Sequence, residues 1–380
     1  MLGVYVTVLL GPTVPLPAPE PISSAIESIE IRNSDEGRDA FQIVLNIGRS
    51  SNMAESLLDY SLVQNPLLAN FNRVIIMVTF GFVPTVLIDG IITHKQLSPS
   101  EEPGQSKMTI TGEDVSIMMD RKEMSTVHPN QPDPVIVTKT IASYAQYGLV
   151  PLVVPPPSLD IPIEVIRTPS QQGTDFQYIT ALAEQYNYVF YVEPTNVPGV
   201  NNAYWGPKDF TSIPQKALTA NMGSDTNISK INFQYSSVES TLVKGSVQDP
   251  VLDMNIPVVT FGSIRPPLAL FPDLLTNINN AKTKQYRTSG SINTIQAYNE
   301  AQSTTEASTD AVTATGDINS AAYGQVLQAR KLVGLRGVGF MHDGFYYVKN
   351  VTHKISREGY KQEFTISREG LGSTTLVVIP

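Results

Sequence analysis

The stretch Tyr360-Lys361-Gln362-Glu363-Phe364-Thr365-Ile366-Ser367, close to the C-terminus, has the clearest alternation of apolar and polar residues in the chain. Because successive side chains of a strand point to opposite faces, it is predicted to be a β-strand with Phe364 and Ile366 on a buried face. Residues 346–355 are predicted to form the preceding strand, and Ser356-Arg357-Glu358-Gly359 is a four-residue connection of a kind common in hairpins. The sequence therefore predicts an antiparallel hairpin that packs on a core.

The first third of the chain has the same character. Strand signals, as judged by alternation or by β-branched runs, occur at residues 29–32, 41–47, 74–97 and 107–111. The polar run Ser34-Asp35-Glu36-Gly37 is the predicted turn between the first two, and Ile110 is predicted to face the core. We therefore expect residues 1–122 to form one antiparallel β-domain, a barrel or a sandwich.

The middle of the chain carries helix signals. Asp133-Pro134 is a favourable helix start, and Gly148 is placed to end that helix. Thr174-Asp175 offers a cap for a second helix, which a strand follows at residues 189–192. We therefore expect an α+β insertion over residues 123–225.

Strand signals return after this insertion, and we expect residues 226–380 to form a second β-domain. Within it, residues 276–320 are rich in Asn, Thr, Ser and Ala, which predicts either a loop or a weak solvent-facing helix. The expected fold class is thus mainly β with an α+β insertion, built on two antiparallel β-barrel-like domains.

The composition narrows the range of functions. The formal charge of −9 does not supply the basic surface of a general nucleic-acid-binding protein. Cys is absent, which excludes disulfides, thiolate metal sites and cysteine nucleophiles. The apolar opening, residues 1–10, has no basic region before it, and no stretch approaches the roughly 20 apolar residues that span a bilayer. We therefore expect a protein made in the cytoplasm without a signal peptide, with no nucleic-acid binding and no membrane insertion.

The sequence does not predict a catalytic or metal site. The four His residues lack metal-ligand spacing, and His94 and His353 are expected to be hydrogen-bonded residues of strands. Glu101-Glu102 and Glu113-Asp114 are adjacent carboxylates, but neighbouring residues of a strand face opposite ways, and the first pair lies in a Pro-Gly turn. We expect no catalytic residue, no metal and no organic cofactor.

Two distant segments follow one plan. The first consists of Asp89-Gly90, Thr93-His94-Lys95 and Thr109-Ile110-Thr111-Gly112-Glu113. The second consists of Asp343-Gly344, Thr352-His353-Lys354 and Thr365-Ile366-Ser367-Arg368-Glu369-Gly370. Each is predicted to be an Asp-Gly turn followed by a hairpin, and we hypothesise that the chain contains a structural duplication.

Several further segments add to this plan, and their order and spacing over almost the whole chain are more specific than any one motif. They are Asp89-Gly90, Thr93-His94, Gly112-Glu113-Asp114, Phe176 to Pro194, Gly334-Leu335-Arg336-Gly337, Asp343 to Val348, Val351-Thr352-His353 and Gly359-Tyr360. In these segments the chain resembles the late-control protein D family, the hub proteins of contractile-tailed phages. That family is similar in turn to the base of VgrG spikes in type VI secretion. The polar stretch 276–320 departs from the family pattern.

The resemblance implies two tube-forming β-domains per chain and a homotrimer with pseudo-six-fold symmetry. The implied function is a structural baseplate hub that connects the six-fold inner tube to the three-fold central spike of a contractile tail or contractile injection system. The implied partners are two further copies of the chain, the inner tube ring, a separate spike protein and other baseplate subunits of a virion or injection particle. A separate spike is expected because the chain ends ten residues after Gly370.

Two other interpretations remain open at this point. A β-rich receptor-binding or fibre-adaptor protein of a phage-like particle would share the composition, but the repeated hairpin and the helical insertion favour the hub. A cell-wall-degrading baseplate enzyme is less favoured because no catalytic constellation is found in the sequence.

Overall fold

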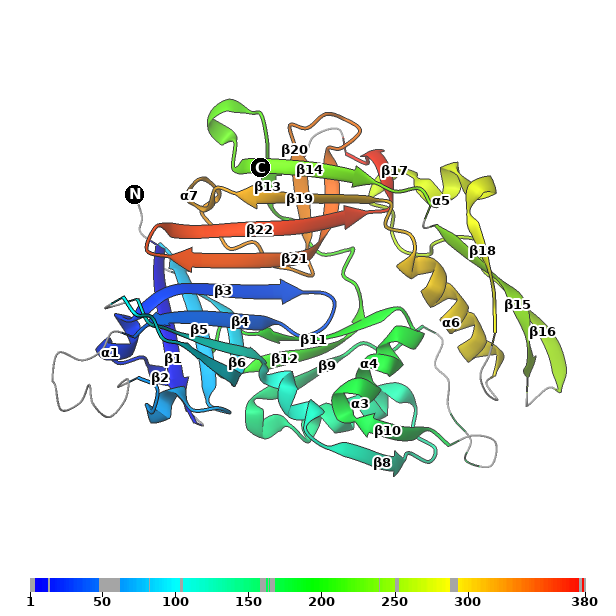
Figure 1. Cartoon of the computed structure of the whole chain (residues 1–380). Coiled ribbons are helices and arrows are strands. Elements are labelled where there is room, and N and C mark those ends of the chain that lie inside the picture. The colour runs from blue at the N-terminus through cyan, green and yellow to red at the C-terminus, as the bar shows by residue number, and fades with distance from the viewer. Residues whose placement is uncertain are drawn as a thin grey trace.

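The structure is a computed structural model that describes residues 4–12, 14–47, 62–81, 83–102, 105–157, 162, 164, 168–238, 240–249, 253–287, 293–375 and 378. It is mainly β, with one large sheet, antiparallel except for the parallel pair β13–β20, shared by two β-units (Figure 1). Within the described residues, strand order along this sheet is β14-β19-β22-β21-β3-β4-β7-β6-β5-β1-β2, with β20 and then β13 joined through β21. The expected fold class is confirmed.

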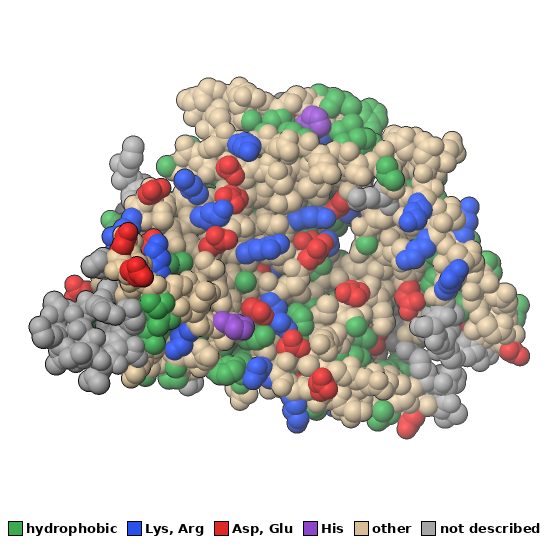
Figure 2. All heavy atoms as spheres, viewed as in Figure 1, with side chains coloured by type: hydrophobic (Ala, Val, Ile, Leu, Met, Phe, Trp, Pro, Cys, Tyr) green, Lys and Arg blue, Asp and Glu red, His purple; other side chains and the backbone are tan. Residues whose placement is uncertain are grey.

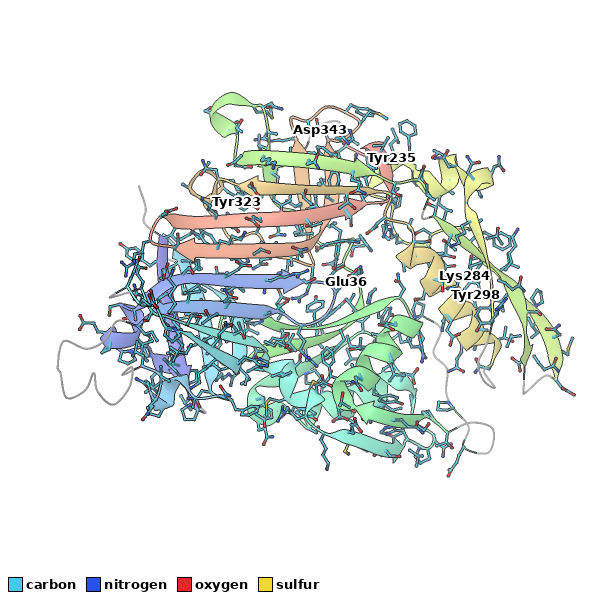
Figure 3. The ribbon with its side chains drawn as sticks, viewed as in Figure 1. Glu36, Tyr235, Lys284, Tyr298, Tyr323 and Asp343 are labelled. Atoms are coloured by element: carbon cyan, nitrogen blue, oxygen red, sulfur yellow. The ribbon has the colours of Figure 1, made fainter. Side chains whose placement is uncertain are left out.

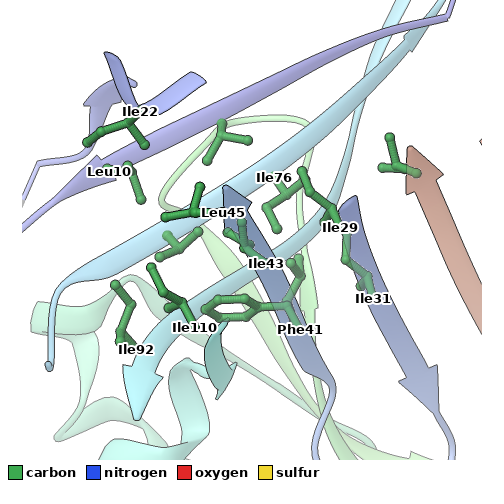
Figure 4. Close-up of a cluster of buried hydrophobic side chains, with 14 of the residues drawn as sticks. Leu10, Ile22, Ile29, Ile31, Phe41, Ile43, Leu45, Ile76, Ile92 and Ile110 are labelled. Carbon is green, nitrogen blue, oxygen red and sulfur yellow. The ribbon is translucent and has the colours of Figure 1, made fainter. Parts of the chain in front are cut away.

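The first β-unit is formed by the N-terminal part of the chain. Its elements are β1 (Val4–Gly11), β2 (Leu16–Pro17), α1 (Glu20–Ser23), β3 (Ile26–Ser34), β4 (Ala40–Asn46), β5 (Arg73–Phe80), β6 (Val83–Ser98) and β7 (Lys107–Asp114). Alternate residues of these strands point inward and make one core, which includes Ile31, Phe41 and Ile110 (Figure 4). A side chain at Gly112 would lie 2.4 Å from the Phe41 ring, so the aromatic ring takes the space that a larger residue on β7 would need.

The second β-unit contains the C-terminal hairpin. Its elements are β13 (Gln215–Thr219), β14 (Ile228–Tyr235), β19 (Val312–Ile318), α7 (Ser320–Tyr323), β20 (Leu332–Arg336), β21 (Gly344–Ser356) and β22 (Gly359–Arg368). Phe364 and Ile366 lie in its core, as predicted. The hairpin connection is shorter than predicted: Ser356 pairs with Gly359, so the turn has the two central residues Arg357 and Glu358.

An α+β segment lies between the two units in the sequence. Its elements are β8 (Glu123–Val127), α3 (Asp133–Ala142), β9 (Leu149–Val153), β10 (Ser170–Thr174), α4 (Asp175–Gln185), β11 (Tyr188–Pro194) and β12 (Asn201–Pro207). Both predicted helices are present. Thr174 caps α4 through a capping box with Gln177. Gly148, with φ of 80°, ends a short 3-10 turn after α3 rather than α3 itself, which ends at Ala142.

A second insertion separates β14 from β19 in the second unit. Its elements are β15 (Thr241–Asp249), β16 (Met254–Val259), β17 (Ala269–Pro272), α5 (Asp273–Thr276), β18 (Lys282–Gln285) and α6 (Thr294–Ala307). The expectation of a loop or weak exposed helix over 276–320 is wrong for its second half. The helix α6 buries Ala297 and Ala301 against β15 and β16, and β19 is an interior strand between β14 and β22.

The two β-units repeat one strand plan. The strands pair in the order β3-β4-β7-β6-β5 in the first unit and β14-β19-β22-β21-β20 in the second. Each unit has two β-bulges at matching places. The extra residue is Glu27 in β3 and Ser229 in β14, and it is Thr93 in β6 and Lys349 in β21.

A rare backbone conformation repeats as well. Phe71 and Arg330, which precede β5 and β20, have φ of 68° and 66°, a left-handed conformation that non-glycine residues seldom adopt. Each donates its backbone N–H to the residue just before a bulge: Phe71 to the Ile92 carbonyl at 2.9 Å and Arg330 to the Val348 carbonyl at 2.7 Å. These shared irregularities fix which residue of one unit corresponds to which residue of the other.

The correspondence differs from the one predicted from sequence. Asp89-Gly90 lies inside the long strand β6, not in a turn, whereas Asp343-Gly344 does stand at the end of a turn before β21. The Thr-His-Lys triplets are also not equivalent, because Thr93 is itself the bulge and its counterpart is Lys349. The two hairpins thus share their topology and their bulge, while the short sequence motifs within them do not align.

Candidate functional site

The residues singled out from the sequence are distributed over both β-units and do not form one site. Asp89, Gly90, His94 and Ile110 belong to the first unit, and Asp343, Gly344, His353, Phe364 and Ile366 belong to the second. Three of them, Ile110, Phe364 and Ile366, are core residues. The other residues have distinct structural environments.

Asp89 anchors the α+β segment to the first β-unit. Its buried carboxylate accepts hydrogen bonds from Arg73 at 2.7 and 2.8 Å and from the Asn201 amide at 3.0 Å. Arg73 also donates to the Tyr147 and Gly199 carbonyls. The adjacent Gly90 has no room for a side chain, because a Cβ would lie 2.5 Å from a carbonyl oxygen of β7. Asp89 is therefore a structural link between two parts of the chain.

The two His residues differ. His353 is buried and its Nδ1 lies 2.7 Å from the Tyr360 hydroxyl, and burial lowers the pKa of His353 to about 3. His94 is exposed, with Nδ1 3.0 Å from the Thr93 hydroxyl. Both His residues lie in strands, β6 and β21, and each has a hydrogen-bonding partner.

Asp343 and Gly344 close the turn before β21. The Asp343 carboxylate accepts the Val338 N–H at 2.9 Å, and its carbonyl accepts a hydrogen bond from the buried Arg368 at 2.9 Å. Gly344 has φ of 125°, which favours glycine, and a Cβ there would lie 2.9 Å from Arg368. The pair thus shapes a turn at one end of the second unit, where Figure 3 shows Asp343.

Sequence reasoning missed the polar junction between the units. The Arg330 guanidinium, 5% exposed, forms a salt bridge with Asp39 and donates to the Ser34 carbonyl of the first unit. It also stacks on the Tyr191 ring of β11, with Cζ 4.2 Å from the ring centroid. One side chain of the second unit therefore contacts the first unit and the α+β segment. No local motif around Arg330 marks this role.

Asp39 also touches a second buried carboxylate. Asp114 accepts the Asp39 backbone N–H at 2.8 Å and the Ser116 N–H at 2.8 Å. Burial, followed by the negative charge of Asp39, raises the pKa of Asp114 to about 6. The native state therefore binds a proton at Asp114 more tightly than the unfolded chain does, in which the pKa of this carboxyl is 3.8.

This shift predicts a pH-dependent difference between the wild type and Asp114→Asn. Because the folded pKa is raised, ionised Asp114 costs stability above pH 6, and that cost disappears as the pH falls towards 3.8. Relative to the wild type, the variant should gain about 2 kcal/mol in unfolding free energy between pH 4.5 and 7.5. Denaturant titrations at each pH measure this difference.

The comparison with a variant is needed because His353 acts in the opposite direction. Its folded pKa is lowered, so its stabilising contribution is lost as the pH falls through the range below 6.5. That contribution is common to both proteins and cancels in their difference. A difference that does not change with pH would show that Asp114 is ionised throughout this range.

A cleft with a volume of about 790 Å³ lies between α6, the α+β segment and the residues before β20. Its aromatic lining residues are Tyr186, Tyr188, Tyr191, Tyr204, Phe210 and Tyr298. Figure 3 shows Tyr298 on α6. Two of its acidic groups are engaged: Glu193 pairs with Lys331 at 3.2 Å, and Glu306 accepts the Ser263 hydroxyl at 2.6 Å. The described residues contain no group of three or more His, Asp or Glu placed to hold a metal ion.

The sheet also has a polar face. Lys354 and Glu363 pair across β21 and β22 at 2.5 Å, and Lys107 pairs with Glu27 at 2.6 Å. Figure 2 shows basic and acidic side chains interspersed over the middle of the sheet. Such exposed pairs contribute at most about 1 kcal/mol each to stability, so this face is better described as a charge-balanced, water-compatible surface than as a stabilising element.

Each β-unit has a strand edge that lacks a partner strand among the described residues. One is the outer edge of β14, which pairs only with β19 on its other side. The other is the C-terminal part of β6, residues 94–98, because β5 pairs only with the N-terminal part of β6. Free edges of this kind present unpaired N–H and C=O groups and pair readily with another strand.

No family model and no curated protein matches the sequence. Solved structures do match over almost the whole chain. A tail protein from Neisseria meningitidis MC58 is 15% identical, with a TM-score of 0.66, covering 97% of this chain and 98% of that one. The 43 kDa tail protein of prophage MuSo2 from Shewanella oneidensis is 12% identical, also with a TM-score of 0.66, covering 97% and 99%.

A third match comes from a secretion system. It is an E. coli protein that is a component of the type VI secretion system and exhibits structural similarity to the T4 bacteriophage tail proteins gp27 and gp5. It is 12% identical, with a TM-score of 0.54, and the match covers 94% of this chain and 78% of that one. The chain therefore has the fold of phage tail proteins and of a type VI secretion component. No helix in the described residues has the length and apolar character needed to cross a bilayer.

Proposed function

We propose that this chain is a structural baseplate hub, which connects a six-fold inner tube to a three-fold central spike in a contractile tail or contractile injection particle. The observation that carries the proposal is the repeated β-unit. One chain holds two units with the same strand order and the same two bulges. The likeness in fold to tail proteins and to a type VI secretion component supports it.

The physical reason is a mismatch of symmetry. A connector made of six identical one-unit subunits would match the six-fold tube and not the three-fold spike. A connector made of three such subunits would match the spike and not the tube. A trimer of a chain with two similar units presents six near-equivalent β-units on one side and three copies of its unique parts elsewhere. The α+β segment and the insertion between β14 and β19 are such unique parts.

The proposed partners are two further copies of the chain, the inner tube ring, a separate spike protein and other baseplate subunits. The proposed role requires no catalysis, cofactor or metal. The charge-balanced polar face of the sheet suits a channel wall, because interspersed charges and hydroxyls stay hydrated without attracting one sign of charge. A virion or an injection particle is the proposed location.

The proposal predicts that the purified chain assembles into a trimer. Native mass spectrometry should give a complex of three times the 41.5 kDa chain mass, or a multiple of that complex. Electron microscopy should show a ring with six similar lobes and with other features repeated three times around the axis. A stable monomer at all concentrations, or a ring of six chains, would remove the reason for two units in one chain and overturn the proposal.

A further inference from the structure

We propose that the ring closes by strand pairing between copies: β14 of one chain pairs antiparallel with residues 94–98 of β6 in the next. This inference rests on the proposed trimer and goes further by naming the two edges and their register. The template is the junction inside the chain, where β21 pairs with β3.

The internal junction joins the second unit to the first. Residues 350–356 of β21 pair antiparallel with residues 28–34 of β3, in a register that sets Thr352 opposite Arg32 and His353 opposite Ile31. In addition, the Asp35 N–H donates to the carbonyl of the bulge residue Lys349 at 2.9 Å. The first strand of one unit thus lies along the free half of the long strand of the other.

Each of these edges has a counterpart that is free. By topology β14 corresponds to β3, and residues 94–98 of β6 correspond to the start of the β21 segment that β3 covers. Neither counterpart has a strand partner on its outer side among the described residues. The chain therefore carries one satisfied junction and the two halves of a second.

The matched bulges give the register of the second junction. Because Thr93 corresponds to Lys349, the residues that follow correspond one by one, and Gln96 matches Thr352. Because Ser229 corresponds to Glu27, Gln234 matches Arg32. Gln96 of one copy is therefore placed opposite Gln234 of the next, and Leu97 opposite Phe233.

The side chains at these positions fit an interface. Leu97 is 38% exposed although it shares the core-facing side of its hairpin with Met108, and Phe233 likewise lies opposite the core residue Ala314. Tyr235, at the end of β14 in Figure 3, is 46% exposed and would face Lys95. Pairing the strands would cover apolar surface that is open in the single chain.

The left-handed residues support the same junction. Arg330 reaches across the internal junction to the first unit. Its counterpart Phe71 is 50% exposed, with Arg121 Cζ 4.8 Å from its ring centroid, and Val238, just beyond β14, is 83% exposed. At the junction between copies, an apolar contact near these two residues would replace the internal ion pair.

Repeating the same step closes a ring. Each passage from one unit to the next uses the same edges in the same register, alternately inside a chain and between chains. Three chains give six such steps and leave neither edge free. This pairing is heterologous, since two different surfaces meet, and heterologous contacts generate closed rings when the rotation per step divides a full turn.

A variant in which every chain carries both Gln96→Cys and Gln234→Cys tests the register, because the disulfide would form between position 96 of one copy and position 234 of the next. The chain has no native Cys, so every cross-link involves the introduced residues. Directly opposed residues have Cβ atoms about 4.5–5.5 Å apart, close enough for a bond after small shifts. Mild oxidation of the full-length protein should give a covalently closed trimer on a denaturing, non-reducing gel, and reductant should return the monomer.

Two matched controls use the same chemistry. Thr352→Cys with Arg32→Cys places the pair at the internal junction and should form an intramolecular bond without a change in chain number. Gln96→Cys with Asn232→Cys moves the second cysteine two residues along β14, to a diagonal distance of about 7–8 Å, and should cross-link at least tenfold less. Equal yields for the shifted and the opposed pairs would overturn the proposed register.

A second variant keeps the test independent of cysteine chemistry. Leu97 is 38% exposed, so Leu97→Asp should stay folded, with the circular dichroism spectrum of the wild type, while the trimer is lost. A native trimer that forms no cross-link and tolerates Leu97→Asp would overturn this interface and leave the hub proposal standing. A wild-type chain that is monomeric and forms no cross-link would overturn both.

Discussion

Replacing Ile366 with Asp should abolish the folded protein. Ile366 has no exposed surface and lies in the core of the second β-unit with Val348 and Phe364. A carboxylate there would be buried without a partner, which costs on the order of several kcal/mol. Since domains are stable by only about 5–15 kcal/mol, the second unit should not hold its structure. Soluble yield and circular dichroism measure the loss.

The matched control is Lys361→Ser on the same strand. Lys361 is exposed and opposite Lys354 across the hairpin, so its removal takes away no described salt bridge. The unfolding free energy should change by less than about 0.5 kcal/mol. Equal melting temperatures for Ile366→Asp and Lys361→Ser would contradict the assignment of the buried face.

The parts of the fold that the sequence predicts are those with a local signal. The alternation around Phe364 and Ile366 indicates both a strand and its buried face, because a strand has a period of two. Thr174 indicates a helix start, because its hydroxyl can accept a backbone N–H three residues on. In both cases the residues that define the element lie within one stretch of chain.

The strand β19 shows where such a signal fails. Its sequence, Val-Thr-Ala-Thr-Gly-Asp-Ile, is too polar and too small to indicate an interior strand. The structure gives the reason: a side chain at Gly316 would lie 2.6 Å from the Phe364 ring, so the large residues of β22 require small ones on β19. The apolar signal for this pair of strands is therefore concentrated on one of them.

The functional features of the chain are non-local. Asp89 resembles a turn residue in sequence, but its partners Arg73 and Asn201 come from a neighbouring strand and from the α+β segment. The edges of β14 and β6 are free because no described strand pairs with them, and this depends on how distant segments of the chain pair with one another. A repeated hairpin can be found in the sequence, whereas the register that makes the repeat useful depends on single-residue bulges.

The Arg330 junction leads to the second large expected effect. In Arg330→Met, the apolar stem is retained and the guanidinium is lost, so Asp39 remains buried beside Asp114 without its cation. Removing one partner of a buried ion pair costs about 3–5 kcal/mol. We expect a loss of this size in denaturant unfolding at pH 7.5. The loss should shrink at pH 5, where Asp114 takes up a proton and relieves the repulsion.

A double variant separates the charge from the packing. Adding Asp39→Asn to Arg330→Met removes the uncompensated carboxylate, and the asparagine oxygen still offers an acceptor for the Ser34 N–H. The double variant should therefore be more stable than Arg330→Met alone, and much less destabilised than the two single changes added together. Additive losses would mean that Arg330 acts through its stacking on Tyr191. In that case the two units would be held together by packing and by the strand pair β21–β3, with the ion pair contributing little.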